Sequence, residues 1–279
     1  MKKLLFYFFI SLLFSSNLLA QPKSVYVVDV NNNNILYARN EESVVSIASI
    51  TKLMTALIIV EQDLPLDETI EITQQDVFGT YLKGKPTYSR IGIGSKYTRE
   101  QLLQLALTSS QNRAAYALAR TSKGGLEDFI EQMNKKAAEI GMEHSLFEEP
   151  TGLSNKNVST AKDLVILLNY IKENHPLIAE YSTKPLLNFS KRSVFNTTNK
   201  LIHSKDWDIY IQKTGFINEA GKCVAMLANV AKRQVAIVIL GASSNTERFI
   251  VANDIKHFIE TGTFTEHKKQ KNTKKQHKR

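Results

Sequence analysis

The chain has 279 residues, of which 43% are hydrophobic and 23% are charged, so it can bury a core in one large domain or two small ones. Its single cysteine, Cys223, excludes an internal disulfide framework and a metal cluster held by several cysteines. Cys223 lies in the apolar run 223–227, where we expect a buried and unreactive thiol. The formal net charge of +9 comes mainly from the two ends of the chain.

The first twenty residues have the pattern of a signal peptide. Lys2 and Lys3 give a positive start, residues 4–14 form an apolar core, and residues 18–20 form the cleavage end. This apolar run is shorter than the about 20 residues that a membrane-spanning helix needs. We therefore expect residues 1–20 to direct export and to be removed, with an uncleaved anchor as the alternative.

The other end of the chain is basic. Residues 266–279 hold six lysines, one arginine and one glutamate; without them and the two N-terminal lysines, 27 basic and 26 acidic residues remain. We expect residues 263–279 to form a disordered tail, because the stretch has no apolar face. It is either simply solvated or makes weak contact with an anionic polymer or membrane surface. Nucleic acid is not expected as a partner of an exported chain.

Between these ends the predicted elements begin with a hairpin. Residues 24–29 and 35–37 have strand patterns, and the asparagines at 31–34 form the turn between them. Further elements are expected, in chain order, as an apolar helix over 50–60, a strand over 70–72, a helix capped by residues 98–101, an alanine-rich helix ending at Arg120, and helices over 125–140 and 161–172.

The last third of the chain is rich in strand patterns. Candidate strands cover residues 186–189, 193–196, 209–212, 224–230 and 235–240, and a helix over 246–260 follows them. Strands at both ends with helices between them predict an α+β fold, in which the N-terminal hairpin pairs with the C-terminal strands. We expect a single domain over residues 21–262.

The first candidate for chemistry is Ser49-Ile50-Thr51-Lys52, at the start of the 50–60 helix. Positions three apart lie on one helical face, so the Ser49 hydroxyl and the Lys52 amine can meet. A serine becomes a strong nucleophile when a neighbouring base takes its proton, and a lysine with a lowered pKa can be that base. The spacing recurs once, at Ser159 and Lys162, where Thr160 and Asp163 indicate a helix cap; we interpret Ser159 as structural.

Two further motifs follow Ser49. Ser110-Gln111-Asn112 lies between two predicted helices, and by itself it is also typical of polar capping groups at a helix terminus. Lys213-Thr214-Gly215 occurs once and is predicted to end a strand, where a glycine lets a ligand approach the backbone; such a triplet can also be purely structural.

In this order, the motifs Ser-x-x-Lys, Ser-x-Asn and Lys-Thr-Gly resemble the penicillin-interacting serine peptidases. The longer sequence segments at residues 48–56, 98–103, 149–154 and 213–221 resemble the D-alanyl-D-alanine endopeptidase branch of the low-molecular-mass penicillin-binding proteins. The resemblance implies an antiparallel sheet flanked by two helical clusters, with the site at their junction. It also implies a reaction on peptidoglycan in the periplasm, with no cofactor and no metal.

The resemblance implies a catalytic role for several residues. Ser49 would attack a D-alanyl carbonyl and form an acyl-enzyme, and Lys52, kept neutral in part by the ammonium of Lys213, would accept the hydroxyl proton. Ser110 would relay a proton to the leaving amine. The backbone amides of Ser49 and Phe216 would form the oxyanion hole, each donor being worth about 3–4 kcal/mol.

The resemblance also implies a set of binding residues. Asn112 would hold the substrate amide and the side chain of Lys52. Lys213 and Thr214 would bind the carboxylate on the leaving side, with Gly215 allowing close approach. β-Lactam antibiotics are expected as covalent inhibitors.

Several alternatives differ in how well the sequence fits them. A carboxypeptidase that trims pentapeptide stems stays open beside the endopeptidase, because both leaving groups carry a carboxylate. A class A β-lactamase is disfavoured, since no glutamate is identified as a deacylating base. The chain has no Gly-x-Ser-x-Gly and no His-Glu-x-x-His, which disfavours a histidine triad and a metallopeptidase. A non-catalytic peptidoglycan-binding scaffold is the alternative from a different class.

Overall fold

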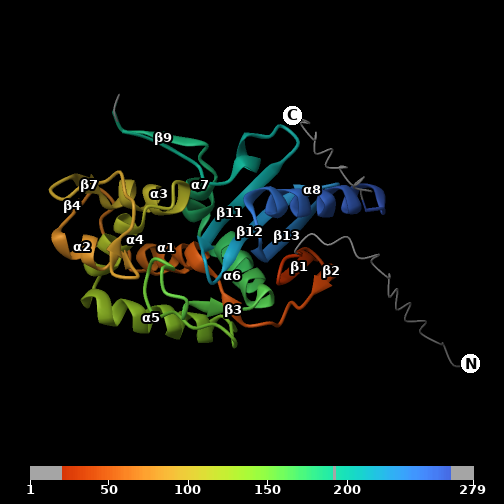
Figure 1. Ribbon diagram of the computed structural model, residues 1–279, viewed down its shortest axis with the longest axis horizontal. Coiled ribbons are helices and arrows are strands. Elements are labelled where there is room, and N and C mark those ends of the chain that lie inside the picture. Colours follow the sequence, from red (N-terminus) through yellow and green to blue (C-terminus); the bar gives the residue numbers. More distant parts are fainter. Residues whose placement is uncertain (1–20, 191–192, 265–279) are drawn as a thin grey trace, which may run out of the picture.

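The computed structural model describes residues 21–190 and 193–264. The predicted signal peptide at 1–20 and all but the first two residues of the predicted basic tail lie outside the described residues. Figure 1 shows the sheet and α8 on one side of the molecule and a cluster of helices on the other. The helices, two of them short 3₁₀ turns labelled η, are η1 (Ala48–Thr51), α1 (Lys52–Glu61), α2 (Gln74–Phe78), α3 (Arg99–Thr108), α4 (Asn112–Arg120), α5 (Gly125–Glu139), α6 (Ala161–Asn174), α7 (Pro176–Thr183), η2 (Lys200–His203) and α8 (Asn245–Thr261).

The central sheet joins the two ends of the described chain. Its five antiparallel strands lie in the order β11 (Asp208–Ile217), β12 (Gly221–Val230), β13 (Arg233–Ala242), β1 (Ser24–Asp29) and β2 (Asn34–Arg39). β13 pairs along the whole of β1, from Ser24 opposite Leu240 to Asp29 opposite Val235. The predicted α+β fold and the pairing of the N-terminal hairpin with C-terminal strands are therefore confirmed.

Alternating side chains of the sheet reach two separate apolar layers. Val25 and Val27 belong to a cluster that includes Ala252 and Ile255 of α8, whereas Tyr26 belongs to the cluster on the other face. The cluster that contains Tyr26 also includes the apolar side of α6 and buried residues of most of the remaining helices. The period of two in β1 thus places one helix on one face and the helical cluster on the other.

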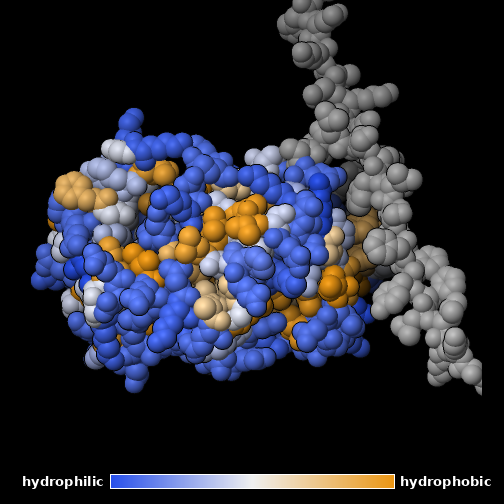
Figure 2. All heavy atoms as spheres, turned by 90° about the horizontal axis from the view of Figure 1, so that it is seen from below, coloured by the Kyte–Doolittle hydropathy of each residue, from blue (hydrophilic) through white to orange (hydrophobic). Residues whose placement is uncertain are grey.

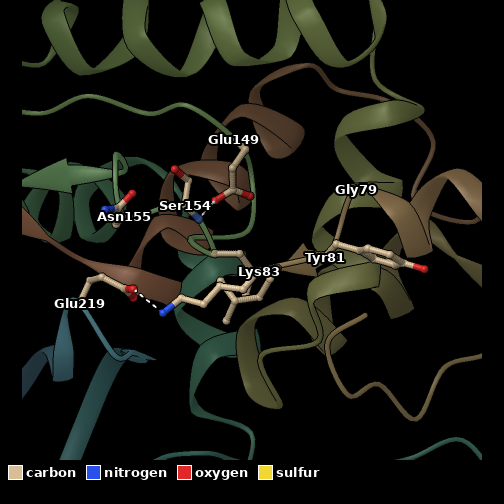
Figure 3. Close-up of a pocket in the computed structure, with 9 residues that line it drawn as sticks. Gly79, Tyr81, Lys83, Glu149, Ser154, Asn155 and Glu219 are labelled. Atoms are coloured by element: carbon tan, nitrogen blue, oxygen red, sulfur yellow. Dashed lines mark hydrogen bonds and ion pairs between the residues drawn. The ribbon is translucent and has the colours of Figure 1, made fainter. Parts of the chain in front are cut away.

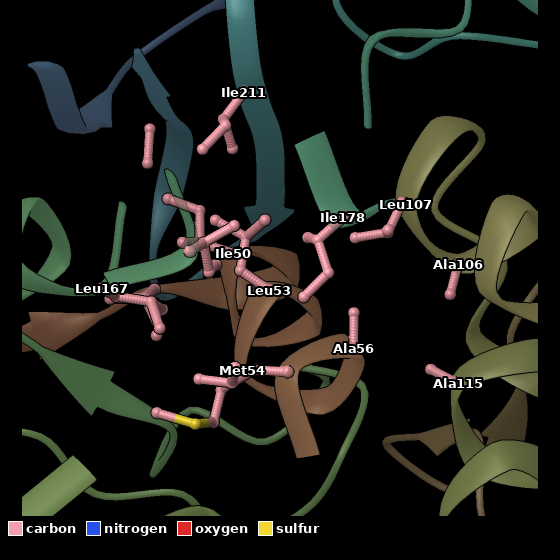
Figure 4. Packing of buried hydrophobic residues seen from close by; sticks show 14 of the residues in the cluster. Ile50, Leu53, Met54, Ala56, Ala106, Leu107, Ala115, Leu167, Ile178 and Ile211 are labelled. Atoms are coloured by element: carbon pink, nitrogen blue, oxygen red, sulfur yellow. The ribbon is translucent and has the colours of Figure 1, made fainter. Parts of the chain in front are cut away.

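Helix α1 lies at the centre of the helical cluster. Its residues from Lys52 to Ile59 are all buried, and it contacts α3, α4, α5, α6 and α7. Figure 4 shows Ile50, Leu53 and Met54 at this centre, with Leu167 of α6 and Ile178 of α7 nearby. A helix that is apolar on every side belongs in a core, and here it holds the start of the helix, with Ser49, in a fixed place.

Short strand pairs connect the helices. They are β3 (Val45–Ser46) with β8 (Val158–Ser159), β4 (Thr69–Glu71) with β7 (Lys96–Thr98), β5 (Tyr81–Leu82) with β6 (Lys85–Pro86), and β9 (Leu186–Asn188) with β10 (Val194–Asn196). Ser159 is buried in β8 with its Oγ 2.7 Å from Ser145 Oγ, and Thr160 Oγ1 accepts a hydrogen bond from the N–H of Asp163. The structural interpretation of Ser159 is confirmed.

Three of the departures from the predicted elements concern α2, α7 and β11. α2 and α7 are not predicted from the sequence, because α2 has only five residues and α7 is separated from α6 by a single residue, His175. The prediction that Lys213-Thr214-Gly215 ends a strand is wrong. β11 continues to Ile217 and pairs Gly215 with Cys223. This glycine therefore lies inside a paired strand and does not mark its end.

Figure 2 shows one face of the molecule, on which hydrophilic residues cover most of the surface and smaller apolar groups lie between them. Within residues 21–190 and 193–264, no helix is long and apolar enough to cross a membrane.

Candidate active site

Ser49 lies in the 3₁₀ turn η1, directly before α1. The turn places its Oγ 2.9 Å from Nζ of Lys52, three residues later, as the helical spacing predicts. Ala48 has a positive φ of 47°, and Thr51 Oγ1 donates to the carbonyl of Ala48, so the backbone around the serine is held from both sides. The hydroxyl and the amine that the sequence pairs are therefore in contact.

The amine of Lys52 is fully buried and has three oxygen neighbours. They are Ser49 Oγ at 2.9 Å, Asn112 Oδ1 at 2.8 Å and the carbonyl of Thr151 at 2.5 Å. Burial lowers the pKa of Lys52 to about 7, although the negative charge of Glu149 acts in the opposite direction. A large share of Lys52 is neutral near pH 7 and can accept a proton from Ser49.

Lys213 is the second buried amine at this place. It extends from β11, and its Nζ lies 2.9 Å from Ser110 Oγ and 3.0 Å from the carbonyl of Thr214. Burial holds the pKa of Lys213 well below its usual range, and the nearby charges of Lys52 and Arg248 lower it further. Burial is thus the main cause of the low pKa at both amines. The expectation that Lys213 depresses the pKa of Lys52 is not confirmed, because only burial lowers the pKa of Lys52, whereas the charge of Lys52 lowers the pKa of Lys213.

Ser110 and Asn112 lie at the junction of α3 and α4. Ser110 has a positive φ of 59°, and Asn112 is the first residue of α4. Asn112 Oδ1 accepts from Lys52, and its Nδ2 donates to Thr87 Oγ1 at 3.3 Å. Gln111, not Asn112, is the residue at the N-cap of α4, so these side chains face the two lysines instead of capping the helix.

The predicted residues share one cavity of about 420 Å³. Its lining includes Ser49, Ser110, Asn112, Thr214, Gly215 and Phe216. Lys52 and Lys213 are fully buried, and they contact the hydroxyls of this lining. The three motifs, far apart in sequence, therefore form a single site.

Gly215 lets β11 lie against the turn that carries Ser49. A Cβ at this position would be 2.8 Å from the carbonyl oxygen of Ile47 and 3.0 Å from the backbone nitrogen of Ser49. A side chain there would force the strand away from the serine. The glycine therefore sets the distance between Ser49 and the strand that faces it.

Comparisons with known proteins agree with this geometry. A family model described as D-alanyl-D-alanine carboxypeptidase, peptidase family S11, matches residues 15–244. The chain belongs to this family. The predicted family of serine D-Ala-D-Ala peptidases is confirmed.

Two relatives with the same name are 41% identical to the chain. One, from Pseudomonas aeruginosa, is named D-alanyl-D-alanine endopeptidase and is aligned over 87% of this chain and 78% of its own length. The other, from Escherichia coli, carries the same name and is aligned over 86% of this chain and 77% of its own length.

Solved structures show the fold of this family. Penicillin-Binding Protein D2 from Listeria monocytogenes, in a cefotaxime-bound form, is 28% identical with a TM-score of 0.73 over 87% of this chain and 98% of that one. A variant of a Streptomyces DD-transpeptidase, 24% identical, has a TM-score of 0.77 over 85% of this chain and 96% of that one.

Two parts of this peptidase's site are not assigned from the sequence. The carbonyl of Thr151 contacts Lys52, and the loop that carries it is held by Glu149, whose carboxylate accepts from the N–H groups of Thr151 and Gly152 at 2.6 Å each. In the sequence, only the turn residues around Pro150 indicate this loop. Gly152 has a φ of 80°, and a Cβ there would lie 2.0 Å from the carbonyl oxygen of Ala48.

The other unassigned part is cationic. Thr198, Lys200 and Arg248 line the cavity with Thr214, and Thr198 Oγ1 lies 2.6 Å from Thr214 Oγ1. Arg248 comes from α8, is almost fully buried and donates to the carbonyl of Cys223 at 2.8 Å; burial lowers its pKa to about 10, so it is charged at neutral pH. Cys223 itself is buried, as predicted, and burial raises the pKa of its thiol to about 11.

The low pKa of Lys52 predicts how stability depends on pH. Between pH 7 and about 10 the unfolded chain holds a proton on Lys52 that the folded chain has lost, so the free energy of unfolding rises with pH across this window. Lys52→Met should reduce this slope by up to about 1.4 kcal/mol per pH unit. Urea unfolding at pH 7, 8 and 9 measures the slope.

Lys205, which is exposed, offers the matched control, and Lys205→Met should leave the slope unchanged. A slope in Lys52→Met equal to that of the wild type would show that Lys52 titrates alike in the folded and unfolded chain.

Proposed function

We propose that this protein is a D-alanyl-D-alanine endopeptidase that hydrolyses the bond between D-Ala and a diamino acid in peptidoglycan cross-links. The observation that carries the proposal is the contact of Ser49 Oγ with the buried amine of Lys52, inside a cavity that also holds the other two motifs. The two relatives named D-alanyl-D-alanine endopeptidase, each 41% identical, support the same reaction.

In the first half of the reaction, Lys52 accepts the proton of Ser49 as Oγ bonds to the D-alanyl carbonyl carbon. The C–N bond of the cross-link then breaks, and the leaving nitrogen takes, by way of Ser110, the proton that Lys52 accepted. Lys213 Nζ lies 2.9 Å from Ser110 Oγ and orients this hydroxyl for the relay. Water subsequently hydrolyses the acyl-Ser49 ester, and the serine and amine return to their starting state.

The oxyanion is assigned to the backbone amides of Ser49 and Phe216. In β11 the N–H of Gln212 donates away from β12, to Ser182 Oγ at 3.2 Å. Because an antiparallel strand alternates in direction with a period of two, the N–H of Phe216 is directed to the same side, toward η1. Two amides directed at one point can stabilise the developing charge.

The leaving side of the cavity suits a carboxylate. Thr198 and Thr214 offer two hydroxyls, Lys200 and Arg248 offer positive charge, and Lys213 adds its amine from behind Ser110. In a cross-link the leaving amine belongs to the D-centre of a diamino acid, which has a free α-carboxylate beside it. Asn112 is placed to hold the substrate amide while it contacts Lys52.

A carboxypeptidase that trims pentapeptide stems is the second candidate. The matching family model bears that description, and a terminal D-Ala also has a carboxylate next to the scissile amide. The intact contacts of Ser49, Lys52 and Ser110 argue against a non-catalytic scaffold. Glu149 holds its own loop with its carboxylate and is not free as a deacylating base of the class A β-lactamase kind.

We also propose export to the periplasm, on the strength of the signal pattern in residues 1–20. β-Lactams are proposed as covalent inhibitors, since their ring carbonyl and carboxylate resemble the D-Ala-D-Ala unit. Penicillin-binding relatives from Listeria monocytogenes, seen in cefotaxime-bound and ampicillin-bound forms, support this.

Acylation by a fluorescent penicillin should depend on Ser49 and on the neutral form of Lys52. With a pKa of about 7 at Lys52, the rate should rise about tenfold between pH 6 and pH 8 and then level off. Intact-protein mass should show one adduct, lost in Ser49→Ala and kept in Ser159→Ala, which changes the other Ser-x-x-Lys serine. An adduct that survives in Ser49→Ala would contradict the assignment of the nucleophile.

Cross-linked muropeptide dimers separate the two candidate activities. The purified protein should convert dimers to monomers faster than it removes the terminal D-Ala of a pentapeptide stem, and Ser49→Ala should do neither. Liquid chromatography of the digest measures both products. Loss of terminal D-Ala with intact dimers would replace the endopeptidase by a carboxypeptidase.

The basic residues 266–279 are proposed to give weak contact with anionic wall polymers. Their deletion should leave turnover of soluble muropeptides unchanged and should weaken binding to isolated sacculi at low salt. Co-sedimentation at about 20 and 200 mM salt measures this difference. Binding that is equal with and without these residues at low salt would remove the proposed contact.

A further inference from the structure

A second cavity, of about 330 Å³, lies beside the active-site cavity and has no role in the steps above. Of the residues that line the two cavities, only Leu153 belongs to both. Figure 3 shows the second cavity, with Lys83 reaching toward Glu219 and with Glu149 and Ser154 on the opposite wall. Its lining combines polar groups with charges of both signs.

The position of this cavity relative to Ser49 decides which part of a substrate it faces. The leaving-side carboxylate belongs near Thr198, Lys200 and Arg248, none of which line the second cavity. The acyl side of the substrate therefore extends from Ser49 in the other direction, past Leu153. Glu219 follows Phe216 by three residues, a reach of at most about 10 Å from the proposed oxyanion hole.

We infer that the second cavity binds the donor stem peptide of the cross-link, and that Lys83 and Glu219 bind the carboxylate and the ammonium of that stem's free diamino acid. The inference rests on the proposed function. The diamino acid directly precedes the D-Ala that acylates Ser49. One residue and a four-carbon side chain span roughly 9 Å, which matches the reach from Phe216 to Glu219.

The ion pair between Lys83 and Glu219 is suited to exchange with a zwitterion. Lys83 Nζ lies 3.1 Å from Glu219 Oε1, and the two side chains are 68% and 36% exposed. Because solvent screens a pair this exposed, a ligand that offers one charge of each sign replaces it at little cost. The two residues come from different elements, Lys83 from the β5–β6 hairpin and Glu219 from the turn between β11 and β12.

The backbones that carry the cavity wall are fixed before a ligand arrives. Lys83 and Gly84 have φ values of 52° and 74°, which is the two-residue hairpin turn that matches the twist of β5 and β6. The opposite wall is held by Glu149, which accepts from the N–H of Ser154. Lys23 Nζ donates to the carbonyl of Glu219 at 2.9 Å. Only the two charged side chains have to move.

The test compares a substrate that has the donor diamino acid with one that lacks its charges. Lys83→Glu and Glu219→Lys should each lower kcat/KM for cross-linked muropeptide dimers by about tenfold, mainly through KM. Cleavage of diacetyl-Lys-D-Ala-D-Ala and acylation by benzylpenicillin should stay within about twofold of wild type. The double charge swap should regain part of the loss on dimers.

Lys85→Glu is the matched control, because Lys85 is exposed on the same hairpin and does not line the cavity. It should leave all three rates unchanged. Equal losses on dimers and on the diacetyl substrate, no loss on dimers, or an equal loss in Lys85→Glu would each overturn the inference.

Failure of the proposed function gives a different result. If wild-type protein leaves dimers intact but trims pentapeptide stems, the endopeptidase proposal fails. The subsite is then tested by the same variants with native pentapeptide against diacetyl-Lys-D-Ala-D-Ala. A selective loss on the native stem supports the subsite, and equal rates overturn it.

Discussion

The structure depends on two lysine amines that are buried together. Removing an ammonium group from water costs several kcal/mol, and two such charges in one place repel each other. Lys52 has three oxygen neighbours, as many as an ammonium has hydrogens, whereas Lys213 has two within the described part of the chain. Burial lowers the pKa of Lys52 to about 7, and the negative charge of Glu149 opposes this shift. In the proposed reaction, the buried amine of Lys52 is what allows Ser49 to act as a nucleophile.

Holding such groups in place requires rigid elements on several sides. Lys52 starts the most buried helix, and Lys213 lies inside a strand that is paired with β12 along its length. The carbonyl of Thr151 comes from a loop that Glu149 and Asn157 fix with hydrogen bonds. The apolar core around α1 thus provides the stability that offsets two desolvated amines, and the site lies where sheet and helices meet.

Much of this arrangement is contained in local sequence. The Ser49 and Lys52 contact follows from helical spacing, and the sheet follows from strand patterns at both ends of the chain. The contact of Lys52 with the Thr151 carbonyl has no side-chain signature, since any residue has a carbonyl. Arg248 reaches the cavity from α8, 33 residues after Gly215, so only tertiary packing reveals it. The sequence also predicts a strand end at Gly215, because the contact of Gly215 with η1 leaves no mark in the sequence.

The residues that bind the leaving-side carboxylate cannot set the preference between endopeptidase and carboxypeptidase activity. A terminal D-Ala and a cross-linked diamino acid both place a carboxylate beside the scissile amide, so Thr198 and Thr214 treat them alike. What differs is the length of chain beyond that carboxylate. The lining of the active-site cavity also includes Lys222, Asn245 and Phe249. Preference for cross-links therefore has to arise on the leaving side beyond that carboxylate. The donor stem is the same in both substrates, and binding energy can favour the cross-link only through groups that it alone contacts.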